Sequence, residues 1–248
     1  MILKCLGSGS SGNCYLLSTE TETLVLDCGL PIREIKKGLD WDISKVVGVL
    51  CSHVHTDHSK AVKDFENMGI PVFAPYKATL GLSNKITYCE GASCNKNFSI
   101  MHFDLTDKNG KFMHTNNDGS ECPCYGFLIE HEDMGKLLYI TDTELVKWRF
   151  SGINHILISC NYQKKYISDS AKRTHVLRGH MELETVKDFV KANKSNALRT
   201  VILCHMGAET TIAEECLAEV QNVVGGGVNV FTAHKGLEVE MREGRCPF

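Results

Sequence analysis

Short apolar runs separated by polar turns recur from one end of the chain to the other. Runs of about four to eight such residues, bounded by glycine, proline or charged side chains, are typical of β-strands. The run at 46–52 is continuous, which is typical of a strand buried on both faces. We therefore expect strands at 2–6, 14–18, 23–27, 46–52, 98–105, 125–131, 137–141, 155–160, 201–204, 228–232 and 237–241.

Three segments instead carry apolar residues at helical spacing. They span 59–68, 182–192 and 212–224, and Gly69 stands where the first helix should end. The segment 108–123 is polar and rich in turn residues, so we expect a loop long enough to suggest a functional role. Strands interspersed with helices favour an α/β fold in which two sheets pack together beneath outer helices. We expect a single domain covering 1–248.

Composition narrows the class of protein only slightly. The chain is 43% hydrophobic and 23% charged, which is ordinary for a globular protein. No apolar run approaches the roughly 20 residues needed to cross a bilayer, and the N-terminus lacks the pattern of a signal peptide, so we expect a cytoplasmic protein. A net charge of −3 disfavours a tight, nonspecific polyanion binder. We interpret the following basic residues as a solvated surface: Lys164, Lys165, Lys172, Arg173 and Arg178.

Twelve cysteines raise the question of disulfide bonds. Cys122 and Cys124 form a CxC pair downstream of Cys89 and Cys94, but no zinc-ribbon spacing follows, so the pattern gives little support to a structural zinc site. Free thiols in apolar runs behave as small hydrophobic side chains, and a cytoplasmic protein keeps them reduced. We expect this of the six cysteines in or beside apolar runs: Cys5, Cys14, Cys28, Cys51, Cys160 and Cys204.

The glycine-rich segment 7–12 follows the first predicted strand and reads Gly-Ser-Gly-Ser-Ser-Gly. It matches the GxGxxG pattern of dinucleotide-binding proteins, and Asp27 lies near the distance expected of a ribose-binding acid. That motif needs a helix directly after the glycines, whereas residues 13–18 are strand-like. We therefore interpret the segment as a tight turn between antiparallel strands, with Ser8, Ser10 and Asn13 as candidates for contact with a substrate phosphate.

The segment His53-Val54-His55-Thr56-Asp57-His58 carries the strongest chemical signal. Residues i and i+2 of an extended chain project to the same side, so His53 and His55 can share one cation, while Asp57 and His58 can face a second. Imidazole and carboxylate groups suit Zn²⁺, and also Mn²⁺ or Fe²⁺. The plain alternative is a histidine-rich surface turn. Three histidines and an aspartate so close together, directly after a buried strand, argue against it.

This HxHxDH motif, preceded by a strand ending in Asp27, resembles the metallo-β-lactamase superfamily, whose fold is a four-layer αββα sandwich. The segment 138–143 resembles the strand whose aspartate, here Asp142, bridges both metals. The segment 201–205 resembles the strand that ends in the last ligand, His205. The resemblance further implies that Asp27 orients a ligand histidine. It implies catalytic roles for Asp57, which would help to hold the second metal, and for His180.

The third motif of the superfamily places a histidine soon after the strand predicted at 98–105. His114 lies in the polar loop, whereas His102 lies inside the strand, and the insertion 107–113 displaces the loop histidine from the family position. We prefer His114 and keep His102 as the alternative. The predicted metal ligands are then His53, His55, Asp57, His58, His114, Asp142 and His205.

Within the superfamily, the glycine-serine turn, the strand before Asp142 and the late Gly179-His180 pair resemble YycJ/WalJ-like exonucleases. They are also similar to phage anti-Pycsar phosphodiesterases. His180 resembles the histidine that helps to protonate the leaving group in the RNase Z-type branch. The chain departs at Ala61, where the branch usually carries glycine, and at 159–161, where a less acidic stretch leaves His180 without an obvious carboxylate partner.

The resemblance implies a metal-dependent phosphodiesterase with two divalent cations, Zn²⁺ before Mn²⁺, that attacks nucleotide phosphodiester bonds with a metal-bridged hydroxide. The substrate would be a nucleic-acid end, as for a 5′–3′ exonuclease, or a small 3′,5′-cyclic nucleotide. Mild acidity favours the small substrate, and the motifs favour the nucleic acid. The alternative is a metallo-hydrolase of a thioester, lactone or β-lactam, because this fold hosts many chemistries. Related phosphodiesterases are commonly dimers, which implies a homodimer.

Overall fold

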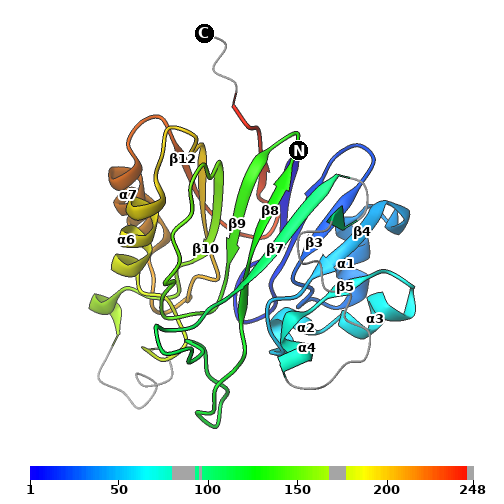
Figure 1. Ribbon diagram of the computed structural model, residues 1–248, viewed down its shortest axis with the longest axis horizontal. Coiled ribbons are helices and arrows are strands. Elements are labelled where there is room, and N and C mark those ends of the chain that lie inside the picture. Colours follow the sequence, from blue (N-terminus) through cyan, green and yellow to red (C-terminus); the bar gives the residue numbers. More distant parts are fainter. Residues whose placement is uncertain (80–92, 95–96, 168–176, 245–248) are drawn as a thin grey trace.

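Two β-sheets face each other in the computed structural model, and helices cover the outer face of each (Figure 1). The structure describes residues 1–79, 93–94, 97–167 and 177–244. The first sheet has the strand order β13 (Glu238–Glu240), β1 (Ile2–Gly7), β2 (Cys14–Ser18), β3 (Thr23–Leu26), β4 (Val46–Leu50) and β5 (Val72–Phe73). The second has the order β12 (Asn229–Thr232), β11 (Thr200–Cys204), β10 (His155–Ser159), β9 (Gly135–Ile140), β8 (Tyr125–His131), β7 (Phe98–Asp104) and β6 (Ser93–Cys94).

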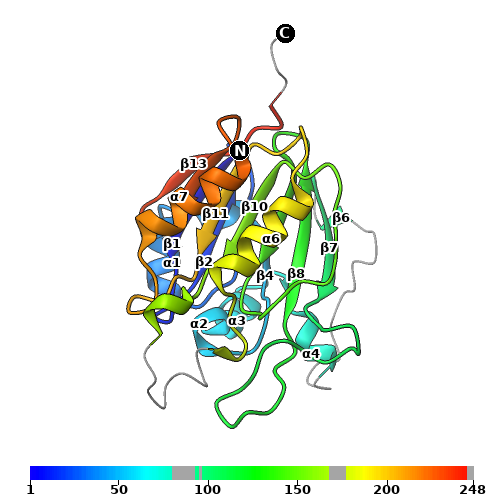
Figure 2. The ribbon, with the colours of Figure 1, turned by 90° about the vertical axis from the view of Figure 1, so that its left-hand side faces the viewer.

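The helices form the two outer layers. On the side of the first sheet lie α1 (Ile32–Gly38), α2 (Thr56–Ser59), α3 (Val62–Asn67) and α4 (Pro75–Thr79). Across the second sheet lie α6 (Leu183–Asn193) and α7 (Ala213–Val224), as Figure 2 shows. Two short 3₁₀ helices, η1 (Ile43–Lys45) and η2 (Lys164–Tyr166), complete the described elements. The four layers confirm the predicted αββα class.

Strand β10 shows how the layers are held together. Leu157 packs in the apolar core between the two sheets, whereas Ile156 and Ile158 belong to the cluster that includes the apolar side chains of α6 and α7. Since both faces of this strand are buried, its sequence is a continuous apolar run. A third cluster, with Ile35 of α1 and Phe65 of α3, covers the outer face of the first sheet.

Parallel pairing carries the functional segments to one end of the sandwich. β3 pairs in parallel with β4 in the first sheet, and β9, β10 and β11 are parallel to one another in the second. The carboxyl ends of parallel strands meet at the same edge of a sheet, where such folds place their sites. The residues that follow these strands therefore gather there.

The predicted strands are confirmed, with ends that shift by at most two residues, and so are the helices predicted at 182–192 and 212–224. The polar segment 108–123 contains neither helix nor strand, as expected. Short elements such as α1 and β5 were not predicted, because a few residues carry too little periodicity to be read. Within the described residues, no helix has the length and apolarity needed to cross a membrane.

The helix predicted at 59–68 is confirmed at 62–67 as α3, but it begins later than expected, because residues 56–59 form the separate short helix α2. The N–H of Ala61 donates to the carbonyl oxygen of Cys28 at 2.9 Å, and the N–H of Cys28 donates to the carbonyl oxygen of His58 at 2.8 Å. These backbone groups bond across to the segment after β3 rather than within one continuous helix. The interruption between α2 and α3 is therefore stabilised by backbone hydrogen bonds to the segment after β3.

The cysteines behave as the sequence predicts. The nine whose side chains the structure describes are all buried and free, among them Cys122 and Cys124. Neither of these two belongs to a candidate metal group of the described residues. Cys89 and the side chain of Cys94 lie outside those residues, as do Lys172 and Arg173 of the basic segment.

Candidate metal centre

Histidine and aspartate side chains from four parts of the chain converge at the end of the sandwich where β4, β9 and β11 finish. They form two groups of possible ligands, and within each group one ligand atom per residue lies within 4.8 Å of the others. The first group is His53, His55 and His114; the second is Asp57, His58, Asp142 and His205. The structure thus brings together every residue predicted as a ligand.

In the first group, His53 and His55 follow β4, and the loop after β7 brings His114 to them. The Nε2 atom of His114 lies 3.0 Å from the Nδ1 atom of His55. The alternative, His102, lies in β7 and packs against Tyr125, with ring centroids 5.7 Å apart. The structure therefore places His114, and not His102, beside the histidine pair.

The second group combines α2 with the ends of β9 and β11. The Nε2 atom of His58 lies 3.4 Å from Oδ2 of Asp57 and 3.4 Å from Oδ2 of Asp142. The Nε2 atom of His205 lies 3.3 Å from Oδ2 of Asp57. His205 has a φ of 48°, and backbone strain of this kind in a non-glycine residue is concentrated at functional sites.

Asp142 stands between the two groups. Its Oδ2 atom lies 3.9 Å from Nε2 of His53 and 3.9 Å from Nε2 of His114 in the first group. The same oxygen is 3.4 Å from Nε2 of His58 in the second. One carboxylate is therefore placed to contact a cation in either group.

The state of His53 fits a metal. Its Nε2 atom is buried and has no hydrogen-bond partner among the residues that the structure describes, which is rare because an unsatisfied buried polar atom is costly. Its Nδ1 atom lies 3.0 Å from the hydroxyl of Ser52, and that hydroxyl donates to Asp27, so Nδ1 carries the proton. The lone pair of Nε2 then faces the cluster. Imidazole and carboxylate donors of this kind are compatible with a divalent metal site.

Burial and mutual contacts set the charges of these side chains. Burial lowers the pKa of His53, and the neighbouring His58 lowers it further. Burial also lowers the pKa of His114, to about 4. For Asp142, burial acts to raise the pKa, but the adjacent His205 and His58 outweigh it and hold the pKa well below its ordinary value. These shifts favour the neutral imidazole for His53 and His114 and the anionic carboxylate for Asp142, which are the forms that bind cations.

Asp27 is a buried carboxylate that orients two of the histidines, one in each ligand group. Its Oδ2 atom accepts hydrogen bonds from Nδ1 of His58 at 2.6 Å, from the hydroxyl of Tyr139 at 2.5 Å and from the hydroxyl of Ser52 at 3.0 Å. Ser52 in turn accepts from His53. The contact with His58 is the one expected of Asp27, and the relay through Ser52 extends it to His53.

Two residues that sequence reasoning missed hold the other histidines of the first group. The Nε2–H of His55 donates to Oδ1 of Asn116 at 3.1 Å, and the Nδ1–H of His114 donates to the carbonyl oxygen of Gly179 at 2.7 Å. Such contacts fix the tautomer and the direction of a ligand ring. The only feature of the sequence that points to them is their position: Asn116 lies two residues after His114, and Gly179 lies one residue before His180.

Asn161, also missed, joins the second group to the segment that carries His180. Its Nδ2 atom lies 2.9 Å from Nδ1 of His205 and 3.2 Å from Oδ1 of Asp142. Its Oδ1 atom accepts from the N–H of Met181 at 2.8 Å. The place of Asn161, two residues after the last residue of β10 and at the same end of the sandwich, is the signal that could have found it.

His180 lies beside both groups. Its ring centroid is 5.8 Å from that of His114 and 6.2 Å from that of His205. The Nδ1 atom of His180 lies 3.3 Å from the carbonyl oxygen of Arg178. The ring also lines the cleft above the cluster. It is therefore within reach of a group bound over the metal ligands.

The three predicted substrate contacts of the glycine-serine turn differ in placement. β1 and β2 pair in an antiparallel manner around the turn, as expected. Ser10 is exposed and lines the cleft, and Ser8 lines its side while its hydroxyl accepts from the N–H of His205 at 2.9 Å. Asn13 is buried, with Nδ2 3.0 Å from Nε2 of His58. This burial argues against a substrate contact for Asn13.

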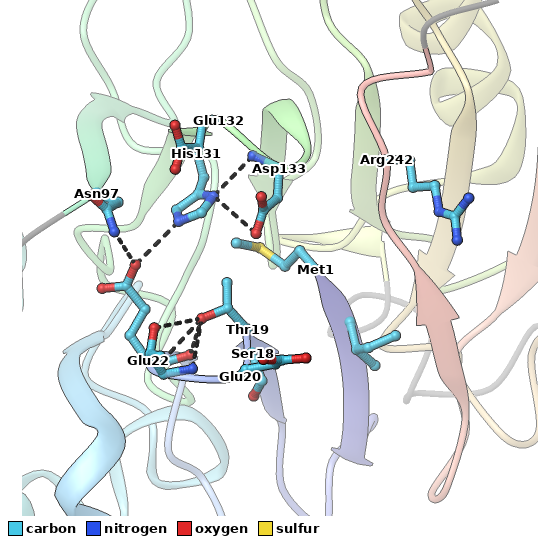
Figure 3. A pocket seen from close by; sticks show the side chains of 12 residues that line it. Met1, Ser18, Thr19, Glu20, Glu22, Asn97, His131, Glu132, Asp133 and Arg242 are labelled. Carbon is cyan, nitrogen blue, oxygen red and sulfur yellow. Dashed lines mark hydrogen bonds and ion pairs between the residues drawn. The ribbon is translucent and has the colours of Figure 1, made fainter. Parts of the chain in front are cut away.

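The cleft has a part of about 430 Å³ over the ligands and a part of about 380 Å³ beside the glycine-serine turn. A larger cavity, of about 720 Å³, lies at the other end of β1 and β2, where Glu22 and His131 meet (Figure 3). Neither ligand group of the described residues lies there. The cleft over the ligands is therefore the candidate active site.

Known proteins resemble this chain in both sequence and structure. The model of the metallo-beta-lactamase superfamily matches residues 7–97. Exodeoxyribonuclease YycJ of Bacillus anthracis is 28% identical over 155 residues, which are 60% of this chain and only 56% of that relative. Exodeoxyribonuclease WalJ of Streptococcus pneumoniae serotype 2 is 24% identical over 230 residues, 84% of this chain and 82% of the relative. The metallo-beta-lactamase fold protein YhfI from Bacillus subtilis superposes with a TM-score of 0.67 at 16% identity, over 96% of this chain and 99% of that one.

A sandwich of two sheets with a histidine–aspartate cluster at its strand ends defines a metallo-hydrolase. The matched residues 7–97 include the whole HxHxDH segment and Asp27. The chain has the metallo-β-lactamase fold, and its residues 7–97 match the model of that superfamily, as the resemblance of its motifs implied.

Proposed function

We propose that this chain is a phosphodiesterase that hydrolyses nucleotide phosphodiester bonds with two divalent cations, Zn²⁺ in the first place and Mn²⁺ as the alternative. The observation that carries the proposal is the pair of adjacent ligand groups with Asp142 between them. Two neighbouring cations suit a phosphodiester, because both the attacking and the leaving oxygen need stabilisation. The similarity to two exodeoxyribonucleases supports this choice of substrate.

In this proposal His53, His55 and His114 would hold one cation and Asp57, His58 and His205 the other, and Asp142 lies close enough to both groups to contribute to either. When bound, the cations supply Lewis acidity toward the phosphoryl oxygens and lower the pKa of a water molecule. The residues behind the ligands keep the donor atoms directed inward.

His180 is proposed to protonate the leaving oxygen. When its Nδ1–H donates to the carbonyl oxygen of Arg178, Nε2 is the nitrogen that exchanges a proton with the substrate. The carbonyl of Gly179 is bonded to His114, and the N–H of Met181 is bonded to Asn161. Both neighbours of His180 are thus anchored to the metal centre, which positions the ring for general acid catalysis.

The substrate is proposed to be either a nucleic-acid end or a small 3′,5′-cyclic nucleotide. The alternative function, hydrolysis of a thioester, lactone or β-lactam, would use the same cluster, because this fold hosts many chemistries. We further propose a cytoplasmic homodimer. The buried free cysteines suit a reducing compartment, and light scattering after gel filtration would give the mass in solution.

The test is a parallel assay of the metal-loaded protein on bis-p-nitrophenyl phosphate, 3′,5′-cyclic nucleotides, 5′-labelled single- and double-stranded DNA, a thioester and a lactone. We expect turnover of phosphodiesters, about two bound cations per chain by elemental analysis, and loss of activity with a chelator. Hydrolysis of the thioester or lactone without hydrolysis of any phosphodiester would overturn the proposal.

A matched pair of variants tests the ligand assignment. His114→Ala should remove one cation and lower phosphodiester turnover at least about 100-fold, because the first group loses a donor. His102→Ala, in the neighbouring strand, should leave cation content and turnover unchanged. Equal cation content in the two variants would show that His114 is not a ligand.

A further inference from the structure

The cleft consists of two compartments that share Ser10, His180 and His205. The metal compartment, of about 430 Å³, is lined by ligands of both groups. The side compartment, of about 380 Å³, lies between the glycine-serine turn and the loop that follows β11. Its described lining includes Ser8 and Ser10 of the turn, Asn161 after β10, and Met206, Gly207 and Thr210 after β11. The proposed function uses the first compartment and leaves the second without a role.

The walls of the side compartment are fixed by hydrogen bonds. On one wall, the N–H of Gly9 donates to Oδ1 of Asn13 at 2.8 Å, and the turn is tied to the other wall by the bond between Ser8 and the N–H of His205. On that other wall, the carbonyl oxygen of Asn161 accepts from the N–H of Gly207 at 3.1 Å and from the hydroxyl of Thr210. The compartment is therefore built before any ligand arrives.

This second wall is packed too closely to accept a side chain at position 207. A Cβ atom there would lie 2.2 Å from Oγ1 of Thr210 and 2.6 Å from the carbonyl oxygen of Asn161. Contacts this short do not occur in real structures, so only glycine allows the loop to fold back onto Asn161. Because the loop after β11 packs closely against Asn161, it does not occupy the space that a ligand would fill.

Among the described lining residues, the two shared histidines are the only titratable side chains. Hydroxyl groups, an amide, backbone and the thioether of Met206 face the space, and no lysine or arginine is among the described lining residues. Phosphates of a nucleic-acid chain are bound mainly by such cations. Hydroxyls and backbone groups instead suit a neutral partner that forms hydrogen bonds, and a volume near the lower end of ligand pockets suits one small unit.

The position of His180 on the boundary between the two compartments indicates which part of the substrate the side compartment binds. His180 lines both compartments, so a leaving oxygen that it protonates lies near their boundary, and the rest of the leaving group can extend into the side compartment. We infer that the side compartment binds the uncharged nucleoside attached to the leaving oxygen of a nucleotide phosphodiester. The inference rests on the proposed function and specifies which part of the substrate the enzyme recognises.

Filling the compartment tests the inference. Ala208→Trp and Ser11→Trp each place an indole at an exposed lining position, and Glu209→Trp adds the same group at an exposed neighbour that does not line the space. The substrates are 3′,5′-cyclic nucleotides and thymidylyl-thymidine, with methyl 4-nitrophenyl phosphate as a reference that carries no nucleoside. Cation content and melting temperature show whether each variant folds.

We expect Ala208→Trp and Ser11→Trp to lower kcat/KM on nucleotides about tenfold or more, mainly through KM, and on the reference less than about threefold. Glu209→Trp should change neither. Thymidine binding, followed by NMR line broadening, should weaken in the same two variants even without turnover. Equal losses on both kinds of substrate, or no loss on either, would overturn the inference. A parent protein that hydrolyses no nucleotide phosphodiester would instead overturn the proposed function.

Discussion

At the scale of single residues, the ligand set is held by bonds that each fix one ring or carboxylate. Asp27 forms a hydrogen bond with His58 directly and is connected to His53 through the hydroxyl of Ser52. His180 differs, because it lies beside the ligands and its proposed role is to move a proton. The two kinds of residue should therefore respond differently to substitution.

His180→Ala should retain the full cation content but lower kcat about 100- to 1,000-fold on diesters with an alkoxide leaving group. On a 4-nitrophenyl ester the loss should be less than about tenfold, because nitrophenolate leaves without a proton. Steady-state kinetics on the two substrates, with elemental analysis of each preparation, check this. An equal loss on both would mean that His180 positions the substrate and does not protonate it.

At the scale of elements, the segment 177–182 before α6 ties the two ligand groups to each other. The carbonyl oxygen of Gly179 binds His114, while its N–H donates to Glu144 at 2.9 Å. Gly179 has a φ of +82°, and a Cβ atom there would lie 2.6 Å from Nδ1 of His114. The close approach of this segment depends on the missing side chain.

Gly179→Ala should displace His114 and weaken the binding of one cation about 10- to 100-fold, measured by competition with a chromophoric chelator. Gly110→Ala is the matched control, since Gly110 has a φ of +84° and no atom of the described residues lies within 4 Å of an added Cβ. It carries the same backbone strain without the contact, so cation affinity should not change. If both variants bind cations alike, the approach to His114 is not what requires glycine.

At the scale of the whole molecule, the two sheets are also joined at the end away from the metal centre (Figure 3). Glu22, in the turn between β2 and β3, accepts hydrogen bonds from His131 at the end of β8, at 3.2 Å, and from Asn97 before β7, at 2.9 Å. Glu22 is 1% exposed and His131 is 3% exposed. A buried pair of this kind leaves one partner unsatisfied when the other is removed.

Glu22→Ala should lower the free energy of unfolding by about 2–4 kcal/mol, because His131 and Asn97 lose a buried acceptor. Glu20→Ala, at an exposed position of the same turn, should change it by less than about 0.5 kcal/mol. Urea unfolding measures both. Cation content and kcat should stay at the parent values, and a loss of bound metal in Glu22→Ala would show that the two ends of the sandwich are coupled.

The sequence by itself determined the layered fold and the ligand-bearing segment 53–58, because apolar runs and a dense histidine motif are local patterns that survive without tertiary contacts. It did not determine where the helix predicted at 59–68 begins, since that depends on backbone bonds to Cys28. Only the tertiary structure decided that His114 rather than His102 joins the histidines and that Asn161 and Gly179 stand behind the ligands. These outcomes depend on which strand ends meet across long stretches of chain, and spacing along the sequence does not specify those distances.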